Sequence, residues 1–207
     1  MLWELYAINC FETYRKDINL YSLWQARIAN PSVTLWHACI TDDRLLEPYA
    51  IINVSLITCF FGLQYAFCSK AAAVNVIQFI ASSLAPNGEF VCIIPDPEQI
   101  LAAANGKTYY VVGNPTYYGD SYVFRYNGSK WEEWLVDIEF LTNECAKRKL
   151  HLMQTSKLTD FAEEYQKDQP EMNLTSSYYI CLKFVKDTGS DIIPATTEEN
   201  FHHCVTV

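Results

Sequence analysis

Apolar positions along the chain alternate between short runs rich in β-branched and aromatic residues and longer stretches with helical spacing. The short runs predict strands at residues 3–9, 32–38, 51–59 and 89–95. Between them we expect helices over about 11–29 and 70–84, the second with Val74, Ile77 and Ala81 on one face. Alternation of this kind predicts an α/β domain built on a mostly parallel sheet.

The second half of the chain changes in character. The elements expected there are antiparallel strands of an insertion at 107–113 and 121–127, a helix over about 133–149, a strand at 151–155, a short helix at 158–165 and a last strand at 176–185. A turn is expected at 85–88, because the residue before a proline disfavours helix and Asn-Gly tolerates positive φ. We expect one domain over 1–186 and a flexible polar tail over 187–207.

Charge and length narrow the function classes. The chain has 207 residues and a net charge of −9, from 24 acidic and 15 basic residues. This disfavours a long electrostatic footprint on nucleic acid, DNA above all, but leaves room for a pocket that grips one nucleotide. The uncharged stretch 51–68 is near the lower limit for a membrane helix. Its β-branched start and internal polar residues fit a buried strand running into a loop better.

Eight cysteines are scattered along the chain, most of them inside apolar segments and none in a CxxC pair. Buried thiols explain this pattern better than a disulfide framework, because the chain shows no signal peptide. His202, His203 and Cys204 could bind a metal, but tail histidines without a second ligand cluster rarely do. We therefore expect no metal site.

Common catalytic and nucleotide-binding motifs do not occur in the sequence. It contains no GxGxxG, P-loop, HExxH or GxSxG motif, and none of its seven glycines falls in the first 60 residues. A nucleotide-binding α/β domain usually has a glycine-rich turn after its first strand.

Five segments, in order, resemble the mRNA cap guanine-N7 methyltransferases, a family with the class I S-adenosylmethionine-dependent fold. CFFGLQYAF resembles the family's CQFxxHYxF, and SSLAPNGEFVCIIPD resembles its LxPGGxFxGTxPD. EEWLV, LTDFAEEY and LTSSYYICLKF resemble PE-aromatic-LV, FxEFYEE and ATSxYxxFxF. The resemblance covers about residues 48–186. It implies a Rossmann-like, mostly parallel sheet with helices on both faces and a small antiparallel insertion.

The resemblance also implies a set of cap-binding residues. The positions that match the family's cap-guanine pocket are held by Phe61, Gln64, Tyr65, Pro95, Glu133 and Tyr178. Gln64 stands where the family has histidine, and its amide still offers a donor and an acceptor to a base edge. Guanine N7 is already a nucleophile, so we expect positioning residues and no catalytic dyad.

The cofactor half departs from the family. The glycine-rich turn is missing, and residues 3–9 resemble the strand that follows it, so the sheet is expected to lack its first strand. That would leave two apolar strand edges unpaired unless the chain is part of a longer protein or the sheet closes in an unusual way. The cofactor positions match Asn9, Cys39 and Phe60 in place of two acidic residues and a glutamine. These departures leave S-adenosylmethionine binding open.

Three interpretations remain on these grounds. The first is a cap guanine-N7 methyltransferase domain, with the 5′ cap as substrate, such as the C-terminal end of a viral capping protein. The second is a methyltransferase-like module that binds the cap or stimulates a catalytic capping subunit. In the third, Tyr65, Trp134 and Tyr178 are only core aromatics, although Gln64 and Glu133 would be unwelcome in a dry core. We expect an upstream capping domain or catalytic subunit as partner, no membrane association, and a cytoplasmic or nuclear protein, the cytoplasm preferred.

Overall fold

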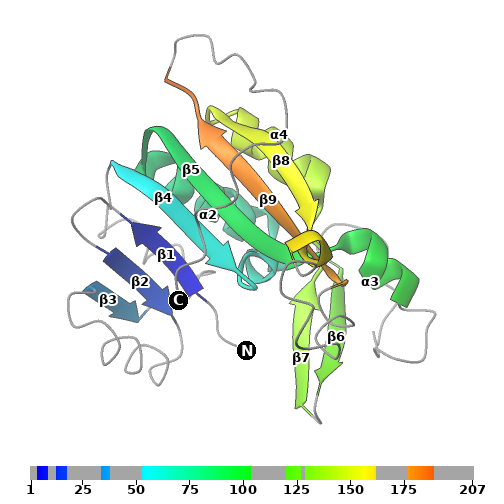
Figure 1. Cartoon of the computed structure of the whole chain (residues 1–207). Coiled ribbons are helices and arrows are strands. Elements are labelled where there is room, and N and C mark those ends of the chain that lie inside the picture. The colour runs from blue at the N-terminus through cyan, green and yellow to red at the C-terminus, as the bar shows by residue number, and fades with distance from the viewer. Residues whose placement is uncertain are drawn as a thin grey trace.

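The computed structural model describes residues 4–8, 13–17, 34–37, 53–103, 120–126, 129–161 and 177–188. Within these residues the chain forms a seven-stranded sheet in the order β3-β2-β1-β4-β5-β9-β8, and a separate hairpin of β6 and β7 (Figure 1). The strands of the sheet are β1 (Glu4–Ile8), β2 (Thr13–Asp17), β3 (Thr34–His37), β4 (Val54–Phe60), β5 (Leu84–Pro95), β8 (Leu150–Lys157) and β9 (Tyr179–Lys186). The hairpin consists of β6 (Ser121–Tyr126) and β7 (Ser129–Trp134).

Strand pairing confirms the α/β fold but shows a mixed sheet in place of the mostly parallel one expected, because four of its six described strand pairs are antiparallel. Strand β4 pairs in parallel with β5, and β2 pairs in parallel with β3. Strand β1 is antiparallel to both β2 and β4, and β9 is antiparallel to both β5 and β8. Five of the seven described strands therefore run in one direction, and β1 and β9 run in the other.

The central position of the sheet corrects the expectation that the first strand is missing. Strand β1, from the segment expected to lie one place further out, sits directly beside β4 and pairs Glu4 with Phe60 and Ile8 with Leu56. Hydrogen bonding to β1 and to β5 therefore satisfies both edges of β4. The sheet is closed by a strand that runs against its neighbours on both sides.

The helix expected over 11–29 is wrong for the part that can be compared. Residues Thr13–Asp17 form β2, which pairs with β1 in a register that sets Ile8 opposite Thr13. The spacing of apolar residues in this segment gives only a local preference for helix. Pairing with β1 and β3 stabilises the strand more than that preference favours a helix. The other residues of that predicted helix lie outside the described part of the chain.

Helix α2 (Lys70–Ser83) and the strands around it match the sequence prediction. The Ser69 hydroxyl caps the helix by accepting a hydrogen bond from the Ala72 amide at 3.1 Å. The apolar face of α2 is buried against the sheet. The predicted turn at 85–88 lies within β5, where Asn87 has φ of 61° and the pairing with β4 shifts register.

Helix α4 (Ile138–Ala146) is shorter than expected, because the predicted helix began five residues too early. The residues before it continue as strand β7 up to Trp134, and Asp137 then caps the helix by accepting a hydrogen bond from the Phe140 amide at 2.9 Å. Leu141 and Cys145 face the core as predicted. Figure 1 shows α2 and α4 together behind the sheet, where they join one apolar core with β4, β5, β8 and β9.

Other elements are the 3₁₀ helices η2 (Leu63–Cys68) and η3 (Leu158–Phe161), and helix α3 (Pro97–Ala103). η3 is the described part of the short helix expected at 158–165, and β8 and β9 confirm the last two strands. The strand expected at 107–113 and the tail from residue 189 onward lie outside the described residues. Among the helices that the structure describes, none is long and apolar enough to cross a membrane.

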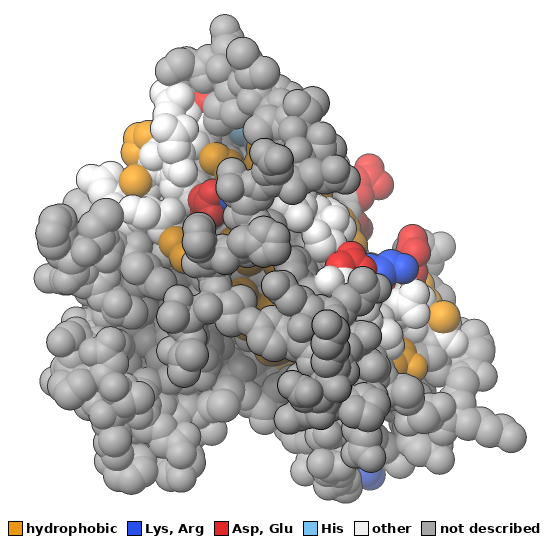
Figure 2. Space-filling model, viewed as in Figure 1, with side chains coloured by type: hydrophobic (Ala, Val, Ile, Leu, Met, Phe, Trp, Pro, Cys, Tyr) orange, Lys and Arg blue, Asp and Glu red, His pale blue; other side chains and the backbone are white. Residues whose placement is uncertain are grey.

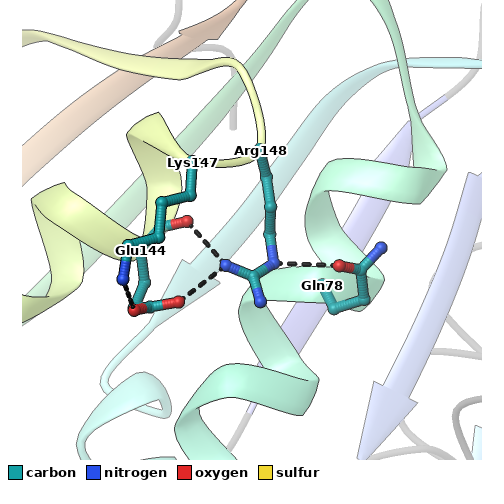
Figure 3. Close-up of polar contacts among 4 residues, drawn as sticks. All are labelled: Gln78, Glu144, Lys147 and Arg148. Atoms are coloured by element: carbon teal, nitrogen blue, oxygen red, sulfur yellow. Dashed lines mark hydrogen bonds and ion pairs between the residues drawn. The ribbon is translucent and has the colours of Figure 1, made fainter.

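A polar cluster joins α4 to α2 on the surface (Figure 3). Arg148 donates to the Glu144 carboxylate at 2.8 Å, and its Nε donates to the Gln78 side chain at 2.9 Å. Lys147 donates to the other carboxylate oxygen of Glu144. Hydrogen bonds from Lys147 and Arg148 lower the pKa of Glu144 below its usual range.

Replacing Glu144 by glutamine should destabilise the protein in a pH-dependent way. Since the folded-state pKa is depressed, the carboxylate's contribution is fully present above the unfolded value of 4.5 and is lost as pH falls through the folded value. Urea denaturation should therefore give a lower midpoint for Glu144→Gln at pH 7, and equal midpoints for both proteins near about pH 2. An equal loss at both pH values would contradict this account.

Candidate functional site

The centre of the candidate site is a carboxylate held inside the protein. Glu133 on β7 is only 1% exposed, and the hairpin register sets it directly opposite Tyr122 on β6. The Tyr122 hydroxyl donates to Glu133 Oε2 at 2.8 Å. From η2, the Tyr65 hydroxyl donates to Glu133 Oε1 at 3.0 Å. Two tyrosines from different elements therefore hold the two oxygens of one buried acid.

The segment that brings Tyr65 to this carboxylate begins with an unusual backbone conformation. Phe61 has φ of 56°, a region that bulky residues rarely adopt. Its amide donates to the Ile93 carbonyl at 2.9 Å, which ties the bend to β5, and its ring meets the Tyr179 ring edge-on at 5.0 Å. The bend turns the chain from β4 into η2, so that Tyr65 reaches Glu133. Such outliers concentrate at functional sites.

Burial and hydrogen bonding shift the pKa of Glu133 in opposite directions. Burial raises the pKa of Glu133 above its usual value, while hydrogen bonds from Tyr122, Tyr65 and the Gln64 amide act to lower it. Burial also raises the pKa of Tyr65 and of Tyr122, and the nearby Glu133 charge raises both further. Both phenols therefore stay protonated and act as donors to the carboxylate.

Gln64 carries an acceptor with no partner. The side chain is fully buried, and its Nε2 donates to the Phe61 carbonyl at 3.1 Å. Its Oε1 has no hydrogen-bond partner within the described residues. An unsatisfied buried acceptor costs about 1–3 kcal/mol, so native proteins keep few of them without a functional reason. A ligand with a hydrogen-bond donor would satisfy it.

The structure gathers most of the six predicted guanine-pocket residues around this carboxylate. Gln64 and Tyr65 contact it directly, and Phe61 starts the segment that carries them. Tyr178 packs against a small buried cluster that contains Tyr122. Pro95, buried at the end of β5, lies opposite Tyr179 in the sheet.

Tyr122 was missed by the sequence analysis, and Glu133 was expected at the start of a helix. A signal for both was present, because Asn127-Gly128 is a typical two-residue hairpin turn. Counting outward from that dipeptide pairs Tyr126 with Ser129 and reaches Tyr122 opposite Glu133, which is the observed register.

Of the three residues expected to bind the cofactor, the structure describes one, Phe60. Asn9 and Cys39 lie outside the described residues, and Phe60 is a half-buried residue at the carboxyl end of β4. Open α/β sheets bind ligands at this edge, usually beside a turn that follows the first strand. Here β1 presents its amino end at that edge, since Glu4 pairs with Phe60. The described residues therefore do not form the usual S-adenosylmethionine cradle. Asn9 was expected at the carboxyl end of the second strand of the fold, whereas the residue at the carboxyl end of β2 is Asp17.

An open hollow of about 740 Å³ lies between α3, η3 and the ends of β8 and β9. Asp96, Glu98 and Asp160 line it, with Lys157 as the basic residue among the described lining. Figure 2 shows acidic side chains and a basic one close together over the region of α3 and η3. A net negative lining does not suit the phosphates of a nucleotide.

Buried thiols account for four of the five cysteines described. Cys59, Cys92, Cys145 and Cys181 are buried, as predicted, whereas Cys68 is exposed. Burial raises the pKa of the Cys59 and Cys145 thiols to about 12. These thiols are therefore protonated and unreactive at neutral pH. His202, His203 and Cys204, at which no metal site was expected, lie outside the described residues.

Solved structures of methyltransferases share this fold. An S-adenosylmethionine-dependent methyltransferase from Mesorhizobium loti matches with a TM-score of 0.54 and 12% identity, over 83% of this chain and 78% of that one. Another from Clostridium acetobutylicum matches with a TM-score of 0.54 and 14% identity, over 84% and 74%. Identities this low establish the fold alone.

Curated relatives are closer in sequence. The mRNA cap guanine-N(7) methyltransferase 1 of Arabidopsis thaliana is 23% identical over 79% of this chain and 49% of that protein. The mRNA cap guanine-N(7) methyltransferase of Drosophila melanogaster is 28% identical over 68% of this chain and 37% of that protein. The chain thus spans half or less of the length of these relatives.

The strongest assignment comes from a family model. The model of the mRNA (guanine-N(7))-methyltransferase domain matches residues 32–187, which include β3 and every later element named above. That is more than half of the chain. The chain therefore belongs to the mRNA (guanine-N(7))-methyltransferase domain family.

Proposed function

We propose that this chain acts as an mRNA cap guanine-N7 methyltransferase domain that holds the guanine of the GpppN cap against Glu133. The observation that carries the proposal is a buried carboxylate that accepts a hydrogen bond from the half-buried Tyr65 and lies next to the unsatisfied acceptor of Gln64. A guanine edge presents two adjacent donors, N1–H and the 2-amino group. Carboxylate and amide oxygens are suitable acceptors for these donors.

The chemistry of N7 methylation agrees with this arrangement. N7 carries its own lone pair, so the enzyme needs to fix the purine in line with a methyl donor and has no proton to remove first. Aromatic rings near Glu133 provide walls for the purine, and the methylated cap is a cationic purine that favours such rings. Trp134, with its ring 5.9 Å from that of Tyr65, belongs to this wall. The family's methyl donor is S-adenosylmethionine, and we assign to these residues only the position of the guanine.

Replacing Gln64 by leucine should weaken binding of the cap analogue GpppG by about tenfold, which corresponds to one hydrogen bond. The stability of the free protein should change little, because the variant removes both an unsatisfied acceptor and the bond to the Phe61 carbonyl. Calorimetric titration and urea denaturation measure the two effects.

Gln154→Leu on β8 is the matched control, because Gln154 is half-buried and bonded to Ser156 in another part of the sheet. The control should bind GpppG as the parent does. Unchanged GpppG affinity in Gln64→Leu would show that the orphan acceptor does not meet the guanine.

A second candidate function is a module that binds the cap, or stimulates a catalytic capping subunit, without transferring a methyl group itself. It is favoured by the reversed direction of β1 at the edge where the cofactor normally binds. Incubation with radiolabelled S-adenosylmethionine and GpppG separates the two. Methyl transfer to N7 supports the enzyme, whereas GpppG binding without transfer supports the module.

A further inference from the structure

The two tyrosines on Glu133 differ in their surroundings. Tyr122 is 1% exposed and belongs to a buried cluster with Ile100 and Leu135. Tyr65 is only partly buried. A ligand that approaches the carboxylate from solvent therefore meets the Tyr65 side first, while Tyr122 lies behind the carboxylate.

The hairpin fixes Tyr122 against Glu133. The two residues are cross-strand partners in β6 and β7, with side chains on the same face. The amide of Leu135 donates to the Asp120 carbonyl at 3.0 Å, which extends the pairing past the base of the hairpin. The Tyr122 bond to Oε2, at 2.8 Å, is thus held by backbone pairing on both sides.

We infer that Tyr122 is a positioning residue that holds Glu133 in one orientation, and that the Tyr65 hydroxyl occupies in the free protein the place which the guanine edge takes in the complex. The inference rests on the proposed function and deepens it. It assigns opposite effects to two hydroxyls that donate to the same carboxylate. Removing the hydroxyl of Tyr122 weakens binding, and removing the hydroxyl of Tyr65 strengthens it.

Titration of the whole chain with GpppG tests this inference through Tyr122→Phe and Tyr65→Phe. Both variants keep the aromatic ring and lose one hydroxyl. Tyr122→Phe should weaken GpppG binding by about tenfold, because the carboxylate loses the donor that orients it. Tyr65→Phe should bind GpppG up to about tenfold more tightly than the parent, because no hydroxyl must be displaced.

The pH dependence of GpppG binding distinguishes positioning from a general loss of structure. Within the described residues, the groups that face Glu133 are Tyr65 and Gln64 of η2 and Tyr122 of β6, with Tyr179 of β9 near both hydroxyls. The tyrosines stay neutral, so the acid limb of binding reports Glu133. Losing the Tyr122 donor should move that limb to higher pH, since the bond lowers the pKa of Glu133.

The outcomes separate this inference from the proposed function. If the parent protein does not bind GpppG, the proposed function fails and the inference fails with it. If the parent binds and Tyr122→Phe keeps its affinity and its pH profile, only the inference is overturned. Should Tyr122→Phe not fold, Tyr65→Phe decides alone, because a tenfold weaker complex would show that its hydroxyl helps to bind the guanine.

Discussion

Replacing Glu133 by glutamine should reduce GpppG affinity by about 100-fold or more. A carboxylate can accept both guanine donors, whereas the glutamine amide accepts one and points a donor at the other; two hydrogen bonds to a charged group are worth at least this much. Calorimetric titration at pH 7 measures the loss. It is the largest effect on binding that the site predicts.

The same substitution should leave the folded protein at least as stable at neutral pH. Because burial raises the folded-state pKa of Glu133, its ionisation costs stability as pH rises through that value, and glutamine removes this cost. The gain should disappear at low pH, where Glu133 is protonated in both states. Urea denaturation at about pH 7 should show the gain in stability, and urea denaturation at about pH 3 should show its disappearance.

Glu132→Gln provides the matched control for Glu133→Gln. Glu132 precedes Glu133 on the same strand, is exposed, and points to the opposite face of the hairpin. Its variant should bind GpppG like the parent. Parent-like affinity in Glu133→Gln, or an equal loss in both variants, would contradict the role given to the buried carboxylate.

Replacing Phe67 by alanine should destabilise the protein by about 3–5 kcal/mol, the usual cost of emptying a buried aromatic site. Phe67 is fully buried in the core, and its ring meets Phe140 of α4 edge-on at 6.3 Å. It anchors the 3₁₀ helix that carries Gln64 and Tyr65. GpppG affinity should therefore fall as well, even though Phe67 is part of the core.

Two control variants show how large the destabilisation by Phe67→Ala is. Phe67→Leu keeps most of the volume and should cost about 1 kcal/mol. Leu101→Ala, at an exposed leucine of α3, should stay within about 0.5 kcal/mol of the parent. Urea denaturation orders the three variants. A Phe67→Ala protein as stable as Leu101→Ala would mean that η2 is not anchored through this ring.

Much of the fold was predicted from the local sequence pattern, in those elements whose local preference agrees with their place in the fold. The β-branched run that became β4 and the helical stretch that became α2 are strong signals, and both elements were predicted nearly in full. Strands β1 and β3 were predicted as well, but β2 was expected to be helical and the place and direction of β1 were not foreseen, because these depend on pairing between distant segments. Nothing in TYRKD alone tells a strand from a helix, and nothing in ELYAI states its direction beside β4.

The candidate site was found by resemblance and completed by the structure. Gln64 and Glu133 drew attention because polar groups in apolar surroundings need partners. Tyr122 escaped notice because an aromatic residue in a strand usually belongs to the core, which is also true here. Only the hairpin register shows that its hydroxyl faces a carboxylate.

The most direct test of the account is calorimetric titration of the chain with GpppG and, separately, with ApppA. Adenine presents no donor at N1 and no 2-amino group, so in the orientation proposed for guanine it offers no donor to the carboxylate of Glu133. We predict saturable GpppG binding and ApppA binding at least about tenfold weaker. Equal affinity for both, or none for either, would contradict the claim that this pocket recognises the cap guanine.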